Sequence, residues 1–114
     1  MKSGINPIVY PTKDLAQAKA LYTKLMGVEP YADEPYYVGF RVGDQEVGLD
    51  PYGHSKGLTG PVAYVHVENI EASLGQLLDA GATEQQPISD VGGGKLIASV
   101  KDADGNDIGL IQEP

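Results

Sequence analysis

The sequence contains one four-residue pattern twice, in two segments that are both predicted to be strands. Asp107-Ile108-Gly109-Leu110 repeats Glu46-Val47-Gly48-Leu49 after 61 positions, with an acid, a β-branched residue, a glycine and a leucine in the same order. Repetition at such a spacing indicates that one supersecondary unit occurs twice. We therefore expect two similar halves, each ending in a strand with a glycine at its middle.

The segments around the repeats follow one order, strand-helix-strand-strand-strand, in both halves. The first-half elements are expected at residues 5–10, 14–27, 29–35, 36–42 and 46–50, and the second-half elements at 62–67, 69–81, 83–91, 95–101 and 107–112. Asp14 and Asn69 are typical helix N-caps. The glycine- and proline-rich residues 50–61 separate the halves. We expect one domain, 1–114, with module one at about 1–57 and module two at about 58–114.

Apolar periodicity predicts which face of each helix is buried. The expected apolar face of the first helix is Leu15, Ala18, Leu21, Tyr22 and Leu25, and that of the second is Ile70, Leu74, Leu77 and Leu78. Both faces are expected to pack against the strands.

Composition excludes several functions. The chain has no cysteine, so disulfides, thiolate metal sites and cysteine nucleophiles are excluded. Its net charge is −8, and residues 58–114 carry 2 basic against 9 acidic side chains. With Arg41 as the single arginine, nucleic acid is an unfavourable partner. No apolar run is long enough to span a membrane, so we expect a soluble, cytoplasmic protein. The acidic field would favour a cationic ligand, although it can equally serve solubility alone.

The doubled order, the first helix from Asp14-Leu15 to Gly27, the Val67-Glu68-Asn69-Ile70 entry to the second helix and the closing Asp102–Asn106 turn resemble the vicinal oxygen chelate superfamily. This superfamily includes glyoxalase I, extradiol dioxygenases, fosfomycin resistance enzymes and bleomycin resistance proteins. The resemblance implies an α+β fold of two tandem βαβββ modules that form a cup-shaped mixed sheet, with the helices outside. It also implies a homodimer.

The resemblance further implies four metal-ligand positions, on the first and last strands of each module. They fall on Pro7, Gly48, Val62 and Gly109. None of these side chains offers the imidazole or carboxylate that zinc, iron, nickel or manganese would need. We therefore expect no metal and no cofactor, which favours binding over catalysis.

Strand alternation predicts which side chains line the cup, because every second residue shares a face. The expected cup residues are Tyr37, Arg41, Glu46, Gly48, Asp50, Tyr64, His66, Ile97, Ser99, Asp107, Gly109 and Ile111. The opposite parity is cleanly apolar, which suits packing against helices. Gly48 and Gly109 have two interpretations: a floor cleared for a planar ligand, or drift after an ancestral metal site was lost.

Three functional hypotheses follow. The leading one is a metal-free protein that sequesters a cationic or aromatic small molecule, as bleomycin resistance proteins sequester a drug. The alternative is a metal-dependent lyase, isomerase or dioxygenase of the glyoxalase type, with His66 and Glu46 as catalytic candidates at a non-standard site. A further alternative is a non-catalytic interaction domain with a vestigial cavity. The cluster of Tyr31, Tyr36 and Tyr37 could stack on a flat ligand or serve as ordinary strand and dimer contacts.

Overall fold

The computed structural model describes residues 4–114, and its elements follow the predicted order. They are β1 (Ile5–Pro11), α1 (Leu15–Met26), β2 (Ala32–Glu34), β3 (Tyr37–Val42), β4 (Gln45–Asp50), a 3-10 turn (His54–Lys56), β5 (Val62–His66), α2 (Ile70–Asp79), β6 (Thr83–Asp90), β7 (Leu96–Lys101) and β8 (Asp107–Gln112). The doubled βαβββ order and the α+β class are therefore confirmed.

The chain divides into two compact units. We call Asn6–Pro61 the N-terminal unit, and Val62–Pro114 together with Gly4 and Ile5 the C-terminal unit. Gly4 joins the C-terminal unit in part because the amide of His66 donates a hydrogen bond to the carbonyl oxygen of Gly4, at 3.0 Å.

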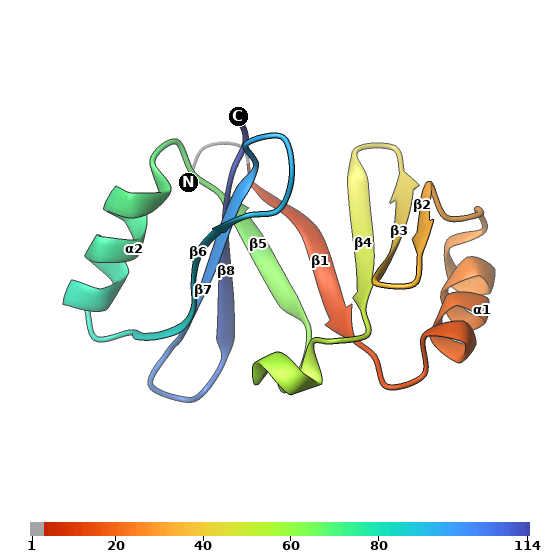
Figure 1. Ribbon diagram of the computed structural model, residues 1–114, viewed down its shortest axis with the longest axis horizontal. Helices are drawn as coiled ribbons and strands as arrows, with labels where there is room; N and C mark the ends of the chain where they lie inside the picture. The colour runs from red at the N-terminus through yellow and green to blue at the C-terminus, as the bar shows by residue number, and fades with distance from the viewer. Residues whose placement is uncertain (1–3) are drawn as a thin grey trace. The chain divides into compact units, whose positions relative to one another are not determined.

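The N-terminal unit has the strand order β2-β3-β4-β1. Strand β4 pairs antiparallel with β3 and parallel with β1, and α1 lies against one face of this sheet (Figure 1). A parallel pair cannot be closed by a tight turn, so the chain between β1 and β4 passes through the helix and a hairpin. Strand β4 thus lies in the interior of the sheet, which fixes the direction of its side chains.

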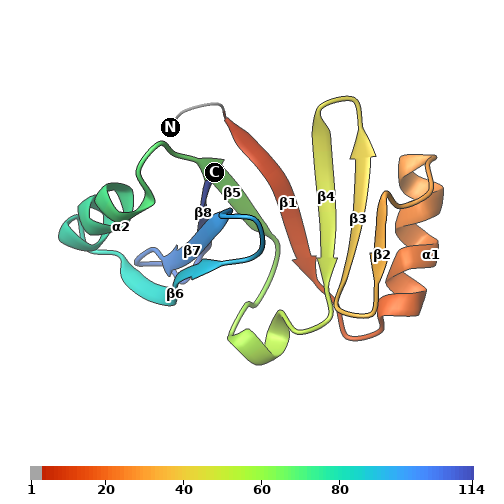
Figure 2. The ribbon, with the colours of Figure 1, turned by 45° about the horizontal axis from the view of Figure 1, so that its top comes forward.

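The C-terminal unit repeats this topology with the strand order β6-β7-β8-β5. Strand β8 pairs antiparallel with β7 and parallel with β5, and α2 covers one face (Figure 2). Strands β4 and β8, which carry the repeated four-residue pattern, therefore occupy equivalent places.

Each helix begins at the predicted cap. The Asp14 carboxylate accepts a hydrogen bond from the Gln17 amide at 3.0 Å, and the Asn69 side chain accepts one from the Ala72 amide at 3.0 Å. Each bond satisfies an amide that the first helical turn leaves without a backbone partner. Gly27 ends α1 in the left-handed conformation, at φ 72°, which glycine adopts without steric cost.

The core of each unit lies between its helix and one face of its sheet. Buried Val38, Phe40 and Leu49 pack against α1, and buried Ala98 and Leu110 pack against α2. The apolar parity of the strands is therefore the helix-facing side, as the alternation predicts. Within residues 4–114, no helix has the length and apolar character needed to cross a membrane.

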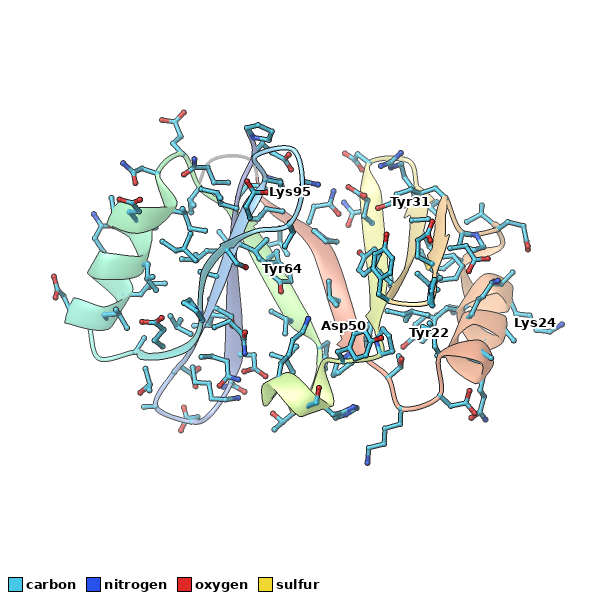
Figure 3. All side chains as sticks on the ribbon, in the orientation of Figure 1. Tyr22, Lys24, Tyr31, Asp50, Tyr64 and Lys95 are labelled. Carbon is cyan, nitrogen blue, oxygen red and sulfur yellow. The ribbon has the colours of Figure 1, made fainter. Side chains whose placement is uncertain are left out.

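The predicted buried face of α1 is partly wrong. Leu21 and Leu25 are 64% and 72% exposed, whereas Tyr22 and Met26 pack on the core. Figure 3 shows Tyr22 directed from α1 toward the sheet and Lys24 directed away from it. The partly buried stripe of α1 runs along one side of the helix and ends next to Gly27, and Leu21 and Leu25 lie on the neighbouring side. Leu78 of α2 is also more exposed than predicted, at 37%.

Two neighbouring residues near the end of α1 test this assignment. Leu25→Gln should change the free energy of unfolding by no more than about 0.5 kcal/mol, because its side chain already meets water. Met26→Gln should lower it by about 1 kcal/mol, because an amide would then replace an apolar group that packs on the core. Urea denaturation of the two variants measures both values, and a larger loss for Leu25→Gln would contradict the assignment.

Candidate functional site

The face of each sheet away from its helix, here called the open face, carries the side chains that the sequence singles out. All twelve predicted cup residues lie on the open faces, because their strand neighbours point toward the helices. They are Tyr37, Arg41, Glu46, Gly48 and Asp50 in the N-terminal unit, and Tyr64, His66, Ile97, Ser99, Asp107, Gly109 and Ile111 in the C-terminal unit.

Within each unit, the strand register places a row of three residues side by side on the open face, and the two rows are equivalent. In the N-terminal unit, Gly48 lies between Gly39 of β3 and Val9 of β1. In the C-terminal unit, Gly109 lies between Ser99 of β7 and Tyr64 of β5. A glycine thus stands at the centre of both rows.

Tyrosine rings lie directly on these glycines. A Cβ atom placed on Gly48 would stand 2.1 Å from Tyr37 Oη, and one placed on Gly109 would stand 2.6 Å from Tyr64 Cδ1. Real Cβ atoms essentially never come so close, so each ring occupies space that any other residue would fill. These glycines therefore serve a close approach of an aromatic ring.

A third ring lies over Gly39. Its hypothetical Cβ would stand 3.0 Å from Tyr31 Cε1. Tyr31 precedes β2, and Figure 3 shows its side chain beside the strands of the N-terminal unit. The open face of this unit therefore carries two tyrosine rings, which come from the loop before β2 and from the start of β3.

The residues at the family's metal positions do not fit a metal. Pro7, Gly48, Val62 and Gly109 offer no donor atom in their side chains, and Tyr rings cover the two glycines. Over residues 4–114, no group of three or more His, Asp or Glu side chains is placed to hold an ion. The side chains at these four positions therefore support no metal-dependent reaction step.

The catalytic candidates are not brought into one cluster by either unit. Glu46 and Asp50 belong to the N-terminal unit, and His66 and Asp107 to the C-terminal unit. Glu46 contacts Arg41, Tyr31 and Asn6 of its own unit, and Asp107 contacts Lys101 of its own unit.

The three carboxylates among the predicted cup residues each have a basic partner. Arg41 Nη2 lies 3.3 Å from Glu46 Oε1, and Lys101 Nζ lies 2.6 Å from Asp107 Oδ1. Both pairs are directly opposite each other across equivalent antiparallel strands, so the duplication includes an ion pair. A third pair joins Lys56 and Asp50 at 2.9 Å. Glu46, Asp50 and Asp107 are therefore each neutralised by a neighbouring lysine or arginine.

Glu46 is the centre of a hydrogen-bonded cluster. Tyr31 Oη donates to Glu46 Oε1 at 2.7 Å, and Asn6 Nδ2 donates to Oε2 at 3.3 Å. The Glu46 amide donates in return to Asn6 Oδ1 at 2.7 Å. The Arg41 guanidinium also stacks on the Tyr31 ring, 4.2 Å from its centroid. These contacts hold the Tyr31 ring in place over Gly39.

The ionisation of Tyr31 should be distinguishable from that of the other tyrosines in an alkaline titration. Burial, with the hydrogen bond to Glu46 next, raises the pKa of Tyr31 from 10.0 to about 12, while Arg41 acts in the opposite direction. The folded pKa is above the unfolded one, so the stabilisation is complete below pH 10 and is lost as the pH rises toward 12. Tyr31→Phe should remove this late step from the tyrosinate absorbance, and Glu46→Gln should move it to lower pH. An unchanged alkaline titration in Tyr31→Phe would contradict the assignment.

Lys101 and Asn6 are absent from the sequence prediction, and Tyr31 appears there only in the tyrosine cluster that could stack on a ligand. Lys101 shares the parity of Ser99 and could have been found by extending the alternation to the end of its strand. Tyr31 lies outside any strand and Asn6 acts through its side-chain amide. Neither of these two has a periodic signal.

The fold recurs in solved structures of distant sequence. A glyoxalase/bleomycin resistance protein/dioxygenase superfamily member from Vibrio splendidus has a TM-score of 0.73 at 13% identity, covering 96% of this chain and 99% of its own. The NAD-dependent benzaldehyde dehydrogenase from Legionella pneumophila has a TM-score of 0.75 at 16% identity, and the match covers 96% of this chain and 99% of that protein's chain. The methylmalonyl-CoA epimerase from Mycobacterium tuberculosis has a TM-score of 0.68 at 16% identity, and the match covers 98% of this chain and 89% of that protein's chain. At these identities the likeness shows the fold alone.

Two tandem βαβββ units, each with a glycine at the centre of its open face, define an α+β protein of the glyoxalase type. The chain belongs to the Glyoxalase/Bleomycin resistance protein/Dioxygenase superfamily, whose pattern matches residues 4–110. The resemblance drawn from the sequence is thereby confirmed. No protein of curated function matches the chain in sequence.

Proposed function

We propose that this protein binds an aromatic small molecule without a metal at the family's ligand positions. The observation that carries the proposal is the placement of the Tyr37 and Tyr64 rings on Gly48 and Gly109, at two of the four positions where metal enzymes of the superfamily carry ligands. Aromatic rings offer a broad apolar surface and stack favourably on other rings. A flat ligand is therefore the chemical match for these faces.

The ion pairs favour an aromatic ligand over a cationic one, the two ligand classes expected from the sequence. Glu46, Asp50 and Asp107 each lie within 4.0 Å of a lysine or arginine nitrogen, so a cation would have to compete with a partner already in place. An uncharged aromatic ligand meets no such competition. In this respect the protein resembles bleomycin resistance proteins, which sequester a drug without altering it, but it would prefer a neutral ligand.

A thermal-shift panel tests the proposal. Neutral and cationic aromatic compounds of similar size are compared with and without a chelator, with small aliphatic compounds as the control. A neutral aromatic ligand at about 100 times its Kd should stabilise the protein by about 2.7 kcal/mol and raise its Tm accordingly. If no aromatic compound raises the Tm at high excess, the proposal is wrong. If a compound binds only without the chelator, the metal-dependent alternative is favoured instead.

Oligomeric state remains part of the proposal. The homodimer and the cytoplasmic location implied by the resemblance and the composition stay predictions. Light scattering of the purified protein, with and without a ligand found in the panel, measures the mass directly.

A further inference from the structure

The Ser99 hydroxyl on β7 is buried and has no hydrogen-bond partner. Ser99 is 2% exposed. Its neighbours Ala98 and Val100 are also buried, and Ala98 packs on the core beneath α2, so the Ser99 side chain points to the open face. A buried hydroxyl without a partner lowers stability, and its presence calls for an explanation.

The Tyr64 ring lies one strand away from this hydroxyl. Ser99, Gly109 and Tyr64 stand side by side across β7, β8 and β5. The Tyr64 ring lies on Gly109, so it extends from β5 across β8 toward the strand that carries Ser99 (Figure 3). The surface over Gly109, here called the ring bed, thus already holds one phenol ring.

On β7 and β8, the residue pairs on either side of the ring bed are apolar or form an ion pair. Ile97 and Ile111, a register pair on the same face, flank it on one side. Lys101 and Asp107, paired at 2.6 Å, flank it on the other. The bed itself therefore favours an uncharged ring, and the Ser99 hydroxyl is the polar group beside it that lacks a partner.

We propose that the ring bed binds an uncharged aromatic ring bearing one hydroxyl, carbonyl or ring nitrogen, and that Ser99 Oγ hydrogen-bonds this polar atom when the Tyr64 ring moves aside. The inference rests on the proposed function and deepens it, because it names the ligand class and the residue that selects it. Ring size is set by the phenol group that the bed already accommodates. Ser99 discriminates phenols, quinones or heteroaromatic rings from plain hydrocarbons of the same shape.

The direct test opens the bed and measures what fills it. Tyr64→Val removes the ring, and the equivalent position of the N-terminal unit is Val9, so the fold already accommodates valine there. Para-cresol, the tyrosine side chain as a free molecule, and toluene, which lacks its hydroxyl, are titrated into this variant by calorimetry. Adding Ser99→Ala should shift the cresol-to-toluene affinity ratio toward toluene by about three- to tenfold, the worth of one neutral hydrogen bond.

Two controls make the result specific to Ser99. Ser89 lies on the same open face, opposite Ile97, and is exposed, so Ser89→Ala in the Tyr64→Val variant should leave the affinity ratio unchanged. Ser99→Ala alone should leave the Tm of the ligand-free protein equal or slightly higher, because it deletes a buried hydroxyl that lacks a partner. An unchanged ratio in Ser99→Ala, or a clear fall in its ligand-free Tm, would overturn the inference.

The same variants separate this inference from the proposed function. If an aromatic compound from the panel binds the wild-type protein and Ser99→Ala equally well, the proposed function stands and the role of Ser99 falls. If no panel compound binds the wild-type protein while the cresol experiment gives the expected ratio, the ring bed stands and the proposed function falls.

Discussion

Replacing Lys101 by methionine should lower the free energy of unfolding by about 3 kcal/mol, because it leaves the Asp107 charge buried without its ammonium partner. The Asp107 side chain is 2% exposed, and Lys101 Nζ lies 2.6 Å from its carboxylate. Methionine keeps most of the volume and apolar stem of lysine, so the loss reports the charge. Urea or guanidinium denaturation followed by circular dichroism measures it.

The duplication supplies the matched control. Arg41→Met breaks the equivalent cross-strand pair, but these side chains are 54% and 26% exposed, so the expected loss is below about 1 kcal/mol. Glu46 also keeps its hydrogen bonds from Tyr31 and Asn6. Adding Asp107→Leu to Lys101→Met should recover most of the stability, since an apolar pair can replace a buried ion pair. Equal losses for Lys101→Met and Arg41→Met would show that burial does not distinguish the two pairs.

This contrast shows how far the two units have diverged. Both keep a basic residue opposite an acidic one and a glycine two positions further along β4 or β8. The aromatic cover, however, comes from different places: from Tyr37 of β3 in the N-terminal unit and from Tyr64 of β5 in the C-terminal unit. The same result, a ring on a glycine, is thus reached from non-equivalent positions, which favours a functional requirement for the ring over chance.

Local patterns were sufficient to predict the elements and their order. Asp14 and Asn69 act as caps through hydrogen bonds within four residues, and alternation along β4 and β8 separates the helix-facing side from the open face. Such signals depend on neighbours in sequence, so one chain suffices to find them. Leu21 and Leu25 were misplaced because helical periodicity accepts several overlapping stripes, and only packing against Phe40 and its neighbours selects one.

Long-range partners could not be predicted in this way. Tyr31 reaches Glu46 from a loop 15 positions away, and Tyr64 meets Gly109 across 45 positions. Nothing in the local pattern states which ring covers which glycine. From the sequence, Gly48 and Gly109 have two interpretations, a floor cleared for a planar ligand or drift after the loss of a metal site. In the structure a tyrosine ring of the chain itself lies against each glycine, and a floor for a planar ligand stays a prediction.

Alanine at position 109 or 48 tests whether each glycine is needed for the tyrosine ring that lies against it. Gly109→Ala should lower the free energy of unfolding by about 2 kcal/mol, because the new methyl group would overlap the Tyr64 ring near its attachment to the backbone, where small rotations cannot clear it. Gly48→Ala should cost less, because the nearest atom there is Tyr37 Oη, at the end of a side chain that can swing away. Denaturation midpoints and slopes of both variants measure these losses.

A double-mutant cycle isolates the contact between ring and glycine. In the Tyr64→Val background, Gly109→Ala should become nearly neutral, because the ring that it would strike is gone and the backbone at residue 109 suits any L-amino acid. The coupling energy should then equal most of the about 2 kcal/mol lost in the single variant. If Gly109→Ala costs as much without the ring as with it, the glycine serves the backbone of β8 instead, and the ring on Gly109 would lose its place as the basis for a ligand-binding face.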